Sequence, residues 1–284
     1  MSGACESGSC AAARVVTTTA LIEDFAVNET DVYYAERDKS SATRIMRVKA
    51  DGGTPTMLAN LVTAQTTGEL ELNNERVFWL MTNGDVFSMP LAGGDSALAN
   101  PMHTYTSGDQ LFVEGQLVFV QNESSLFQVS LATGSETVIR DNAFFMRGID
   151  HGTLYGTSLG QIAVIESGED TPKTLATSFS NMGGMTVSMG RAYWSGRASG
   201  ATAPTLMMRP LSGGVEMLVE DNVLANCIAV DDESIYYAIP YLRRRPLNGG
   251  TSEQIGSSTW QIRLSSSYVY WSEDRGIRRL PKAH

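Results

Sequence analysis

A sequence unit recurs along nearly the whole chain, and this repeat limits the possible folds more than any other feature. Each unit has an alternating apolar segment, a short turn, an aromatic segment, a variable loop, a segment ending in Pro-Leu or a similar pair, and a glycine turn. Successive units are 34–45 residues apart, a period typical of repeat architectures in which each unit forms one module. The aromatic segments begin at Val32, Val77, Val118, Leu154, Ala192, Ile235 and Val269.

The chemistry of the unit favours four antiparallel strands. β-Branched and aromatic residues suit a pleated, half-buried surface, and no segment carries a sustained apolar period of 3.6 residues with helix caps. Gly-Gly pairs such as Gly52-Gly53 and Gly249-Gly250 favour two-residue hairpins. A small sheet cannot bury both faces alone, and stacking in a β-propeller solves that problem. We therefore predict an all-β fold, a single seven-bladed β-propeller with four-stranded antiparallel blades.

The seventh unit is incomplete, because the chain stops three residues after Leu280-Pro281. Residues 14–21, RVVTTTAL, precede the first unit and look like the last strand of the other blades. We expect this N-terminal strand to complete the last blade and to close the propeller, which removes an exposed sheet edge. The predicted organisation is a flexible tail over residues 1–13 and a propeller over residues 14–284.

The repeat resembles the YWTD-type propeller repeat, and more closely the VYW…RxPLxGG…LA repeats of bacterial propeller proteins of uncertain function. The residues that carry the resemblance are Val269-Tyr270-Trp271 with Ser272-Glu273-Asp274, and the Pro-Leu-x-Gly-Gly runs at 210–214 and 246–250. The resemblance covers nearly the whole chain and implies the fold. It departs from YWTD domains in having seven units instead of six, and it implies no activity.

Charge and cysteine content narrow the possible partners and compartments. The net charge of −10 argues against binding to nucleic acid through phosphates, and no apolar run is long enough for a transmembrane segment. We expect a monomer. Ser2-Gly3-Ala4-Cys5 resembles the end of a bacterial lipoprotein signal, so a periplasmic or cell-surface location is one interpretation. The other is a flexible tail on a cytoplasmic protein, since no hydrophobic stretch stands before Cys5.

Oxygen-bearing side chains recur at the start of the first strand of several units, where a propeller opens its central channel. Asp24, Glu69, Asp109 and Asn226 are candidate ligands for calcium or another divalent cation, because hard cations prefer carboxylate and amide oxygens. His103, in the connection that follows the second unit, forms a candidate general base with Glu69. Six-bladed calcium-dependent lactonases and phosphotriesterases have a similar arrangement of carboxylates and amides at the channel mouth. This resemblance of architecture implies a metal-dependent hydrolase of esters, lactones or phosphotriesters, with calcium or zinc.

A second hypothesis is a propeller that binds a small molecule or a protein through its loop-rich face and channel mouth. The loops Glu36–Thr43 and Ser195–Thr205 are the longest predicted on that face, and variable loops on a rigid scaffold often carry function. The candidate binding residues are Trp260, Gln261, Tyr241 and Arg147. The repeat is regular and no strong catalytic motif is present, so binding is the preferred interpretation and hydrolysis the alternative.

Overall fold

Antiparallel β-strands make up the regular structure of the protein. The computed structural model describes residues 5–6, 9–10, 12–61, 66–101, 108–122, 125–141, 144–158, 160–166, 169, 171–176 and 179–282. None of these residues lies in an α-helix, so this part of the chain holds no helix that could cross a membrane. Besides a short hairpin of β1 (Cys5–Glu6) and β2 (Ser9–Cys10), the strands form seven four-stranded sheets, the blades of a β-propeller. The predicted fold class is confirmed.

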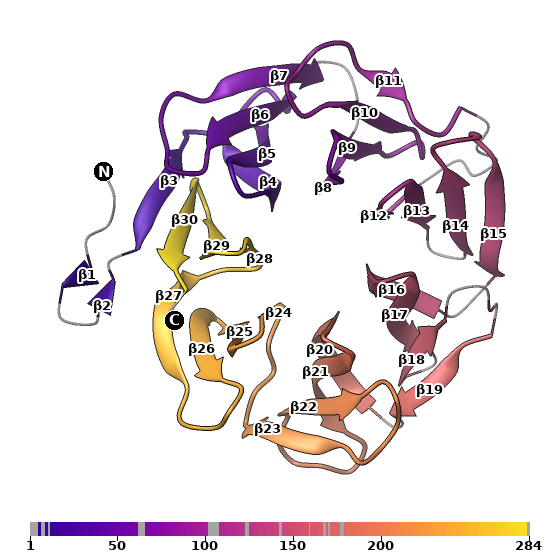
Figure 1. The fold of residues 1–284 in the computed structure, drawn as a ribbon, viewed down its shortest axis with the longest axis vertical. Coiled ribbons are helices and arrows are strands. Elements are labelled where there is room, and N and C mark those ends of the chain that lie inside the picture. Colours follow the sequence, from indigo (N-terminus) through magenta and orange to yellow (C-terminus); the bar gives the residue numbers. More distant parts are fainter. Residues whose placement is uncertain are drawn as a thin grey trace. The chain divides into compact units, whose positions relative to one another are not determined.

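The blades belong to two compact units, which are described separately (Figure 1). Unit 1 comprises Met1–Ile139 and Arg263–Ala283. It contains blades 1, 2 and 7 and most of blade 3, because the boundary of the unit falls within the last strand of blade 3. Blade 1 is β4 (Leu21–Val27), β5 (Asp31–Arg37), β6 (Thr43–Lys49) and β7 (Thr56–Leu61); blade 2 is β8 (Thr66–Leu72), β9 (Arg76–Met81), β10 (Val86–Pro90) and β11 (Ala97–Leu98); blade 3 is β12 (Gln110–Glu114), β13 (Leu117–Gln121), β14 (Ser125–Ser130) and β15 (Glu136–Asp141); blade 7 is β28 (Ile262–Leu264), β29 (Tyr268–Glu273), β30 (Gly276–Pro281) and β3 (Ala13–Thr17).

Unit 2 comprises Arg140–Ile262 and His284, and it contains blades 4, 5 and 6. In both units the first strands of consecutive blades lie next to each other. Blade 4 is β16 (Phe144–Asp150), β17 (Thr153–Ser158), β18 (Gln161–Ile165) and β19 (Lys173–Ala176); blade 5 is β20 (Phe179–Ser188), β21 (Arg191–Ala198), β22 (Thr205–Pro210) and β23 (Met217–Asp221); blade 6 is β24 (Ile228–Val230), β25 (Ser234–Ile239), β26 (Tyr241–Pro246) and β27 (Glu253–Ser258).

The N-terminal strand completes the last blade, as predicted. β3 pairs antiparallel with β30, with Ala13 opposite Arg279 and Val16 opposite Ile277. The pairing satisfies the outer edge of β30 and places Val16, 1% exposed, in a hydrophobic cluster with residues of blades 7 and 1. The last blade is therefore built from both ends of the chain.

Hydrophobic clusters fill the spaces between consecutive blades of each unit. The aromatic segments are the second strands of the blades, and their rings are almost entirely buried. Blades 7 and 1, 1 and 2, and 2 and 3 each share a cluster in unit 1, and blades 4 and 5, and 5 and 6, share one in unit 2. Each sheet thus covers its neighbour, which is how the repeat solves the burial problem. The largest buried rings are those of Trp79, Trp194, Trp271, Tyr33, Tyr34, Tyr193, Tyr236, Tyr237 and Tyr270.

The glycine turns differ from the prediction in length. The third and fourth strands are joined by residues 50–55, 91–96, 211–216 and 247–252, which are six-residue connections and not two-residue hairpins. In blade 2 the N–H of Leu91 still donates to the carbonyl of Glu75 at 2.9 Å, so the chain turns only after the leucine. The predicted positive φ is present, at 95° for Gly93 and 126° for Gly94. These angles lead the chain out of the turn toward the outer strand.

The two loops predicted to be long are shorter in the structure. β5 continues to Arg37 and β6 begins at Thr43, so the first connection is residues 38–42. There Asp38 Oδ1 accepts the N–H of Ser40 at 2.8 Å and of Ala42 at 3.2 Å, which holds the chain in a tight turn. In blade 5, β21 ends at Ala198 and β22 begins at Thr205, so the connection consists of residues 199–204.

The β3–β30 pairing predicts a sharp contrast between two neighbouring positions. Val16→Asp places a charge in the cluster of blades 7 and 1, and we expect it to lower the free energy of unfolding by at least ~3 kcal/mol. Thr17→Asp adds the same charge one residue away on an exposed side chain, and we expect a change within ~0.5 kcal/mol. Urea unfolding measures both, and equal effects would contradict the packing of β3 as the outer strand of blade 7.

Candidate functional site

Four charged side chains from three blades of unit 1 converge on the first strands. Asp24 lies on β4, Glu69 and Glu71 on β8, and Arg263 on β28. We call these four residues the acidic cluster. Glu69 and Glu71 flank Leu70 on β8, and the charges of Asp24 and Glu71 both act on Glu69. The cluster therefore holds three carboxyl groups and one guanidinium group.

β-Bulges position the two carboxylates at the start of the strands. In blade 1 the pairing of β4 with β5 shifts between Ile22 and Asp24, and in blade 2 the pairing of β8 with β9 shifts between Thr66 and Leu70. A bulge turns side chains away from their regular direction and interrupts the ladder. The bulges thus lie where Asp24 and Glu69 leave the regular sheet and face the neighbouring blade.

Asp24 is bound from two blades besides its own. Its Oδ1 accepts the N–H of Phe25 at 2.7 Å, and its Oδ2 accepts the N–H of Leu70 on blade 2 at 2.9 Å. Arg263 Nη2 of blade 7 lies 3.4 Å from Oδ1. Glu69 repeats the arrangement one blade further on, because its carboxylate accepts the backbone N–H of Leu111 in blade 3. Each carboxylate thereby links its blade to the next.

Arg263 also reaches the second carboxylate of blade 2. Its Nη2 lies 3.8 Å from Glu71 Oε1, so one guanidinium group serves Asp24 and Glu71. The side chain of Asp24 is 6% exposed, whereas those of Glu71 and Arg263 are 27% and 34% exposed. A ligand approaching the cluster would meet Glu71 and Arg263 first, with Asp24 behind them.

Burial and the repulsion between carboxylates raise the pKa values in the cluster. Burial, together with the charges of Asp24 and Glu71, raises the pKa of Glu69 from 4.5 to about 8, against the opposing effect of Arg263. Burial raises the pKa of Glu71 to about 7, and water at its exposed edge moderates the effect. Burial also raises the pKa of Asp24, although Arg263 and two backbone N–H groups oppose it. The cluster therefore holds a proton near neutral pH.

The predicted metal ligands are only partly brought together. Asp24 and Glu69 lie close enough for the charge of Asp24 to raise the pKa of Glu69. Asp109 is exposed at the start of blade 3, and Asn226 is exposed in unit 2. Within the described ranges, no three His, Cys, Asp or Glu side chains are grouped so that they could hold a metal ion. His103, the predicted base, lies outside the described residues.

The predicted binding residues all belong to unit 2. Tyr241 is 50% exposed and pairs with Ser258, and the N–H of Thr259 donates to the carbonyl of Pro240 at 3.2 Å. Trp260 follows directly and is 71% exposed, so two exposed aromatic side chains come from adjoining segments of blade 6. Gln261, the residue after Trp260, is partly buried. Arg147 is exposed on β16 of blade 4.

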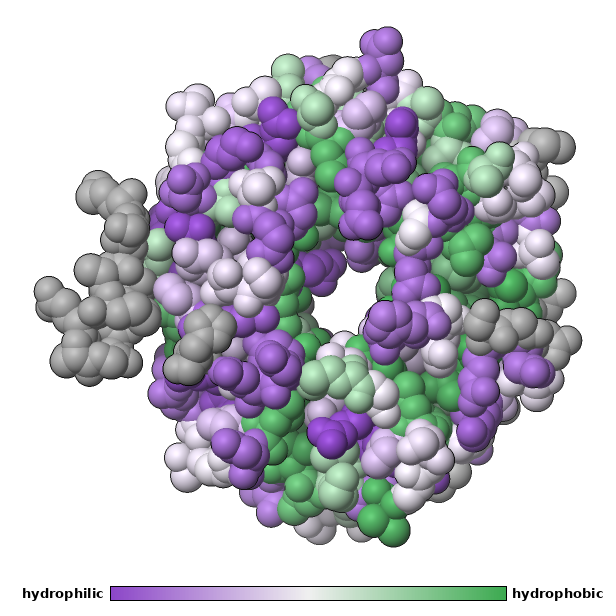
Figure 2. All heavy atoms as spheres, viewed as in Figure 1, coloured by the Kyte–Doolittle hydropathy of each residue, from purple (hydrophilic) through white to green (hydrophobic). Residues whose placement is uncertain are grey.

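Hydrophilic and hydrophobic residues are unevenly spread over the surface. Figure 2 shows hydrophilic residues gathered over β4–β7 and β28–β30, and hydrophobic residues at the outer part of blade 5. Val215, 78% exposed, and Leu218, 54% exposed, belong to that part. Asp24 and Arg263 of the acidic cluster belong to these more hydrophilic blades, and Glu69 and Glu71 belong to blade 2.

Glu71 and Arg263 were not predicted from the sequence. Glu71 follows Glu69 by two residues, and Arg263 follows Gln261 by two, so strand alternation was the available signal. The pairing of Arg263 with Asp24 joins positions 239 residues apart, and no spacing rule predicts such a contact.

Similar structures support the fold and nothing finer. No protein-family model matches the sequence, and no curated protein gives a significant match. The extracellular domain of a putative one-component system from B. thetaiotaomicron matches 95% of this chain with a TM-score of 0.70 and 10% identity. The present chain spans 39% of that protein's chain. YCF48 bound to D1 peptide matches with a TM-score of 0.70 and 11% identity, and the match covers 96% of this chain and 94% of the YCF48 chain. An oligogalacturonate lyase in complex with manganese matches with a TM-score of 0.67 and 9% identity, and the match covers 90% of this chain and 86% of the lyase chain.

The raised pKa of Glu69 predicts that stability falls as the solution becomes more alkaline. The folded protein holds a proton that the unfolded chain releases between pH 4.5 and about 8, so this group costs stability as pH rises through that window. Glu69→Gln keeps an acceptor for Leu111 and removes the titration. We expect it to stabilise the protein by ~1–3 kcal/mol near pH 8 and to change little near pH 5.

The matched control is Glu216→Gln, an exposed glutamate in the glycine turn of blade 5. It removes the same charge and should leave the pH profile of unfolding unchanged. If Glu69→Gln had the profile of the wild type, the cluster would not hold the proton.

Proposed function

We propose that the protein is a binding propeller that recognises a positively charged group, an amine or a guanidinium, at the acidic cluster of unit 1. One observation carries the proposal: two carboxyl groups share one guanidinium group, at 3.4 Å from Asp24 and 3.8 Å from Glu71, and a third, that of Glu69, lies beside them. A second cation beside Glu69 and Glu71 would favour their charged forms, against the burial and the repulsion that raise their pKa values. The ligand is a small molecule with a basic group or a basic segment of a protein.

The exposed aromatic pair of blade 6 supports a protein as one class of ligand. Tryptophan and tyrosine are common anchors of protein interfaces, and Trp260 is 71% exposed on a segment that a backbone hydrogen bond holds in place. The peptide-bound propeller among the similar structures gives a precedent for this mode in the fold. It is a likeness of architecture at 11% identity.

The proposal predicts a charge-specific loss of binding. A triarginine peptide serves as the probe in calorimetry at low salt, and Glu71→Gln should weaken its binding about tenfold, as expected when a charge-assisted hydrogen bond is lost. Binding should strengthen from pH 6.5 to pH 8.5, because the cluster must lose its proton. The released proton makes the measured heat depend on the buffer.

Glu216→Gln controls for net charge, since it removes one exposed carboxylate far from the cluster in sequence and leaves Glu71 intact. We expect its affinity to stay within twofold of the wild type. If the two variants weakened binding equally, the attraction would come from the overall charge of −10 and the proposed site would be wrong.

A metal-dependent hydrolase is the second candidate function. The observation in its favour is the pair Asp24 and Glu69, because a carboxyl with a pKa of about 8 beside another acid suits general acid–base chemistry. The manganese-bound lyase shows that a protein of similar fold takes a metal. The residues proposed to hold calcium or another divalent cation are Asp24 and Glu69 of unit 1.

Melting with EDTA and then with added calcium or zinc separates the two functions. The hydrolase would be favoured if EDTA lowered the melting temperature of the wild type and one cation restored it, while the melting temperature of Glu69→Gln did not respond to that cation. An unchanged melting temperature together with triarginine binding favours the binding propeller.

A further inference from the structure

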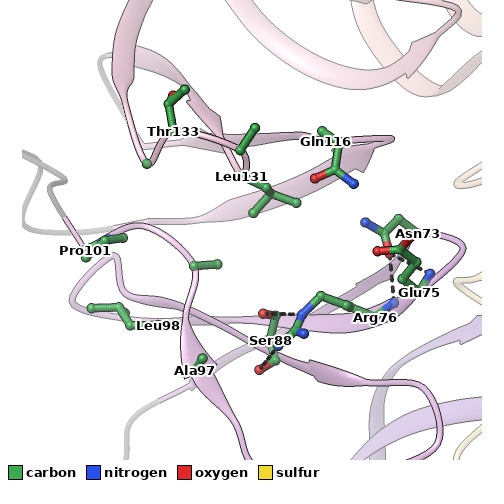
Figure 3. Close-up of a pocket in the computed structure, with 13 residues that line it drawn as sticks. Asn73, Glu75, Arg76, Ser88, Ala97, Leu98, Pro101, Gln116, Leu131 and Thr133 are labelled. Carbon is green, nitrogen blue, oxygen red and sulfur yellow. Dashed lines mark hydrogen bonds between the residues drawn. The ribbon is translucent and has the colours of Figure 1, made fainter.

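A cavity of about 450 Å³ lies between blades 2 and 3 of unit 1 (Figure 3). It lies where β8 ends, on the side of the blades that carries the glycine turns, whereas Glu69 lies in the bulge nearer the start of β8. Its volume is within the range of small-molecule sites, and its walls combine apolar and polar side chains. The residues that matter for the argument are Arg76, Ser88, Leu98, Pro101, Gln116 and Leu131.

The neighbouring interface, between blades 1 and 2, shows how the corresponding space is filled there. Tyr33 and Arg47 face each other across β5 and β6. The hydroxyl of Tyr33 donates to the carbonyl of Leu91 in blade 2 at 3.1 Å, and Arg47 Nη1 donates to the same oxygen at 2.8 Å. A phenol and a guanidinium from one blade thus satisfy one carbonyl of the next.

Blade 2 lacks both donors at the same positions. Phe78 and Ser88 face each other across β9 and β10, in the places of Tyr33 and Arg47. Leu131 of blade 3 corresponds to Leu91, since its N–H donates to the carbonyl of Gln116 at 2.9 Å just as Leu91 donates to Glu75. Phenylalanine has no hydroxyl and serine is short, so the space beside Leu131 is left as the cavity.

Arg76 supplies a hydrogen-bond donor to the same cavity. Its Nε donates to Ser88 Oγ at 2.9 Å and its Nη2 to the carbonyl of Ser88 at 3.2 Å. A guanidinium group carries five N–H donors, so further donors remain for an oxygen in the cavity. Its charge disfavours a cationic occupant, and Glu75 in the wall disfavours an anionic one.

We propose that this cavity binds a small phenol, a neutral aromatic compound with a ring hydroxyl. The hydroxyl replaces that of Tyr33 in the neighbouring interface, donates to the carbonyl of Leu131 and accepts from Arg76. Leu98, Leu131 and Pro101 supply the apolar surface for the ring. The site is independent of the acidic cluster and of the function proposed for it.

The test uses 4-methylphenol as the probe and toluene as the analogue without a hydroxyl. By calorimetry and thermal shift on the full chain, 4-methylphenol should bind at least about fivefold more tightly than toluene, the effect of one or more hydrogen bonds. Ser88→Arg places the arginine of blade 1 in blade 2 and should abolish binding. Glu216→Gln, at an exposed residue of blade 5 outside the cavity, should retain it.

Leu98→Trp is the second filled variant, for use if Ser88→Arg fails to fold. Leu98 is 38% exposed at the rim of the cavity, so a larger side chain there can fill the cavity without disturbing the buried core. Loss of binding in either filled variant, with retention in Glu216→Gln, supports the site. Failure of the wild type to bind 4-methylphenol, equal affinity for toluene, or unchanged binding in a folded filled variant would overturn it.

Discussion

The pairing of β3 with β30 is the interaction on which the candidate site depends. Blade 7 has three strands from the end of the chain and takes its fourth from the beginning. An ion pair of 2.9 Å between Arg14 and Glu273, 259 positions apart, reinforces the pairing. The strand contributes Val15 and Val16 to the cluster that packs blade 7 on blade 1. That packing fixes β28, which carries Arg263 to the carboxylate of Asp24.

Blade 5 differs from blades 1 and 2 near the start of its first strand. In blades 1 and 2, Asp24 and Glu69 accept backbone N–H groups of the next blade. In blade 5 of unit 2, the N–H of Gly184 donates directly to the carbonyl of Ala225 at 2.6 Å. A Cβ on Gly183 would lie 2.3 Å from that oxygen, so only glycine permits the approach. Blade 5 is therefore joined to its neighbour here without burying a charge, whereas the carboxylates of blades 1 and 2 join theirs at a cost in desolvation energy.

The repeat predicted the blades because strand formation depends on local pattern. Aromatic and β-branched residues at a period of two fix which strand is buried, and the incomplete last unit indicated the role of residues 14–21. The same pattern did not predict the lengths of the glycine turns, since the hydrogen bond of Leu91 to Glu75 depends on a neighbouring strand. At the site, the alignment of strand starts identified Asp24 and Glu69. It missed Arg263, whose role depends on the packing of three blades, and Glu71, which a strict reading of strand alternation would have included.

Departures from the repeat mark the places where this scaffold has room for function. Blade 1 satisfies the carbonyl of Leu91 in blade 2 with the donors of Tyr33 and Arg47. Where blade 2 places Phe78 and Ser88 instead, it gives up hydrogen bonds and packing, and a cavity remains. Where blades 1 and 2 place buried carboxylates instead of glycine, they accept raised pKa values. Both departures cost stability in a fold that elsewhere shows how to avoid that cost, so the sites that they create are the ones where ligands are expected.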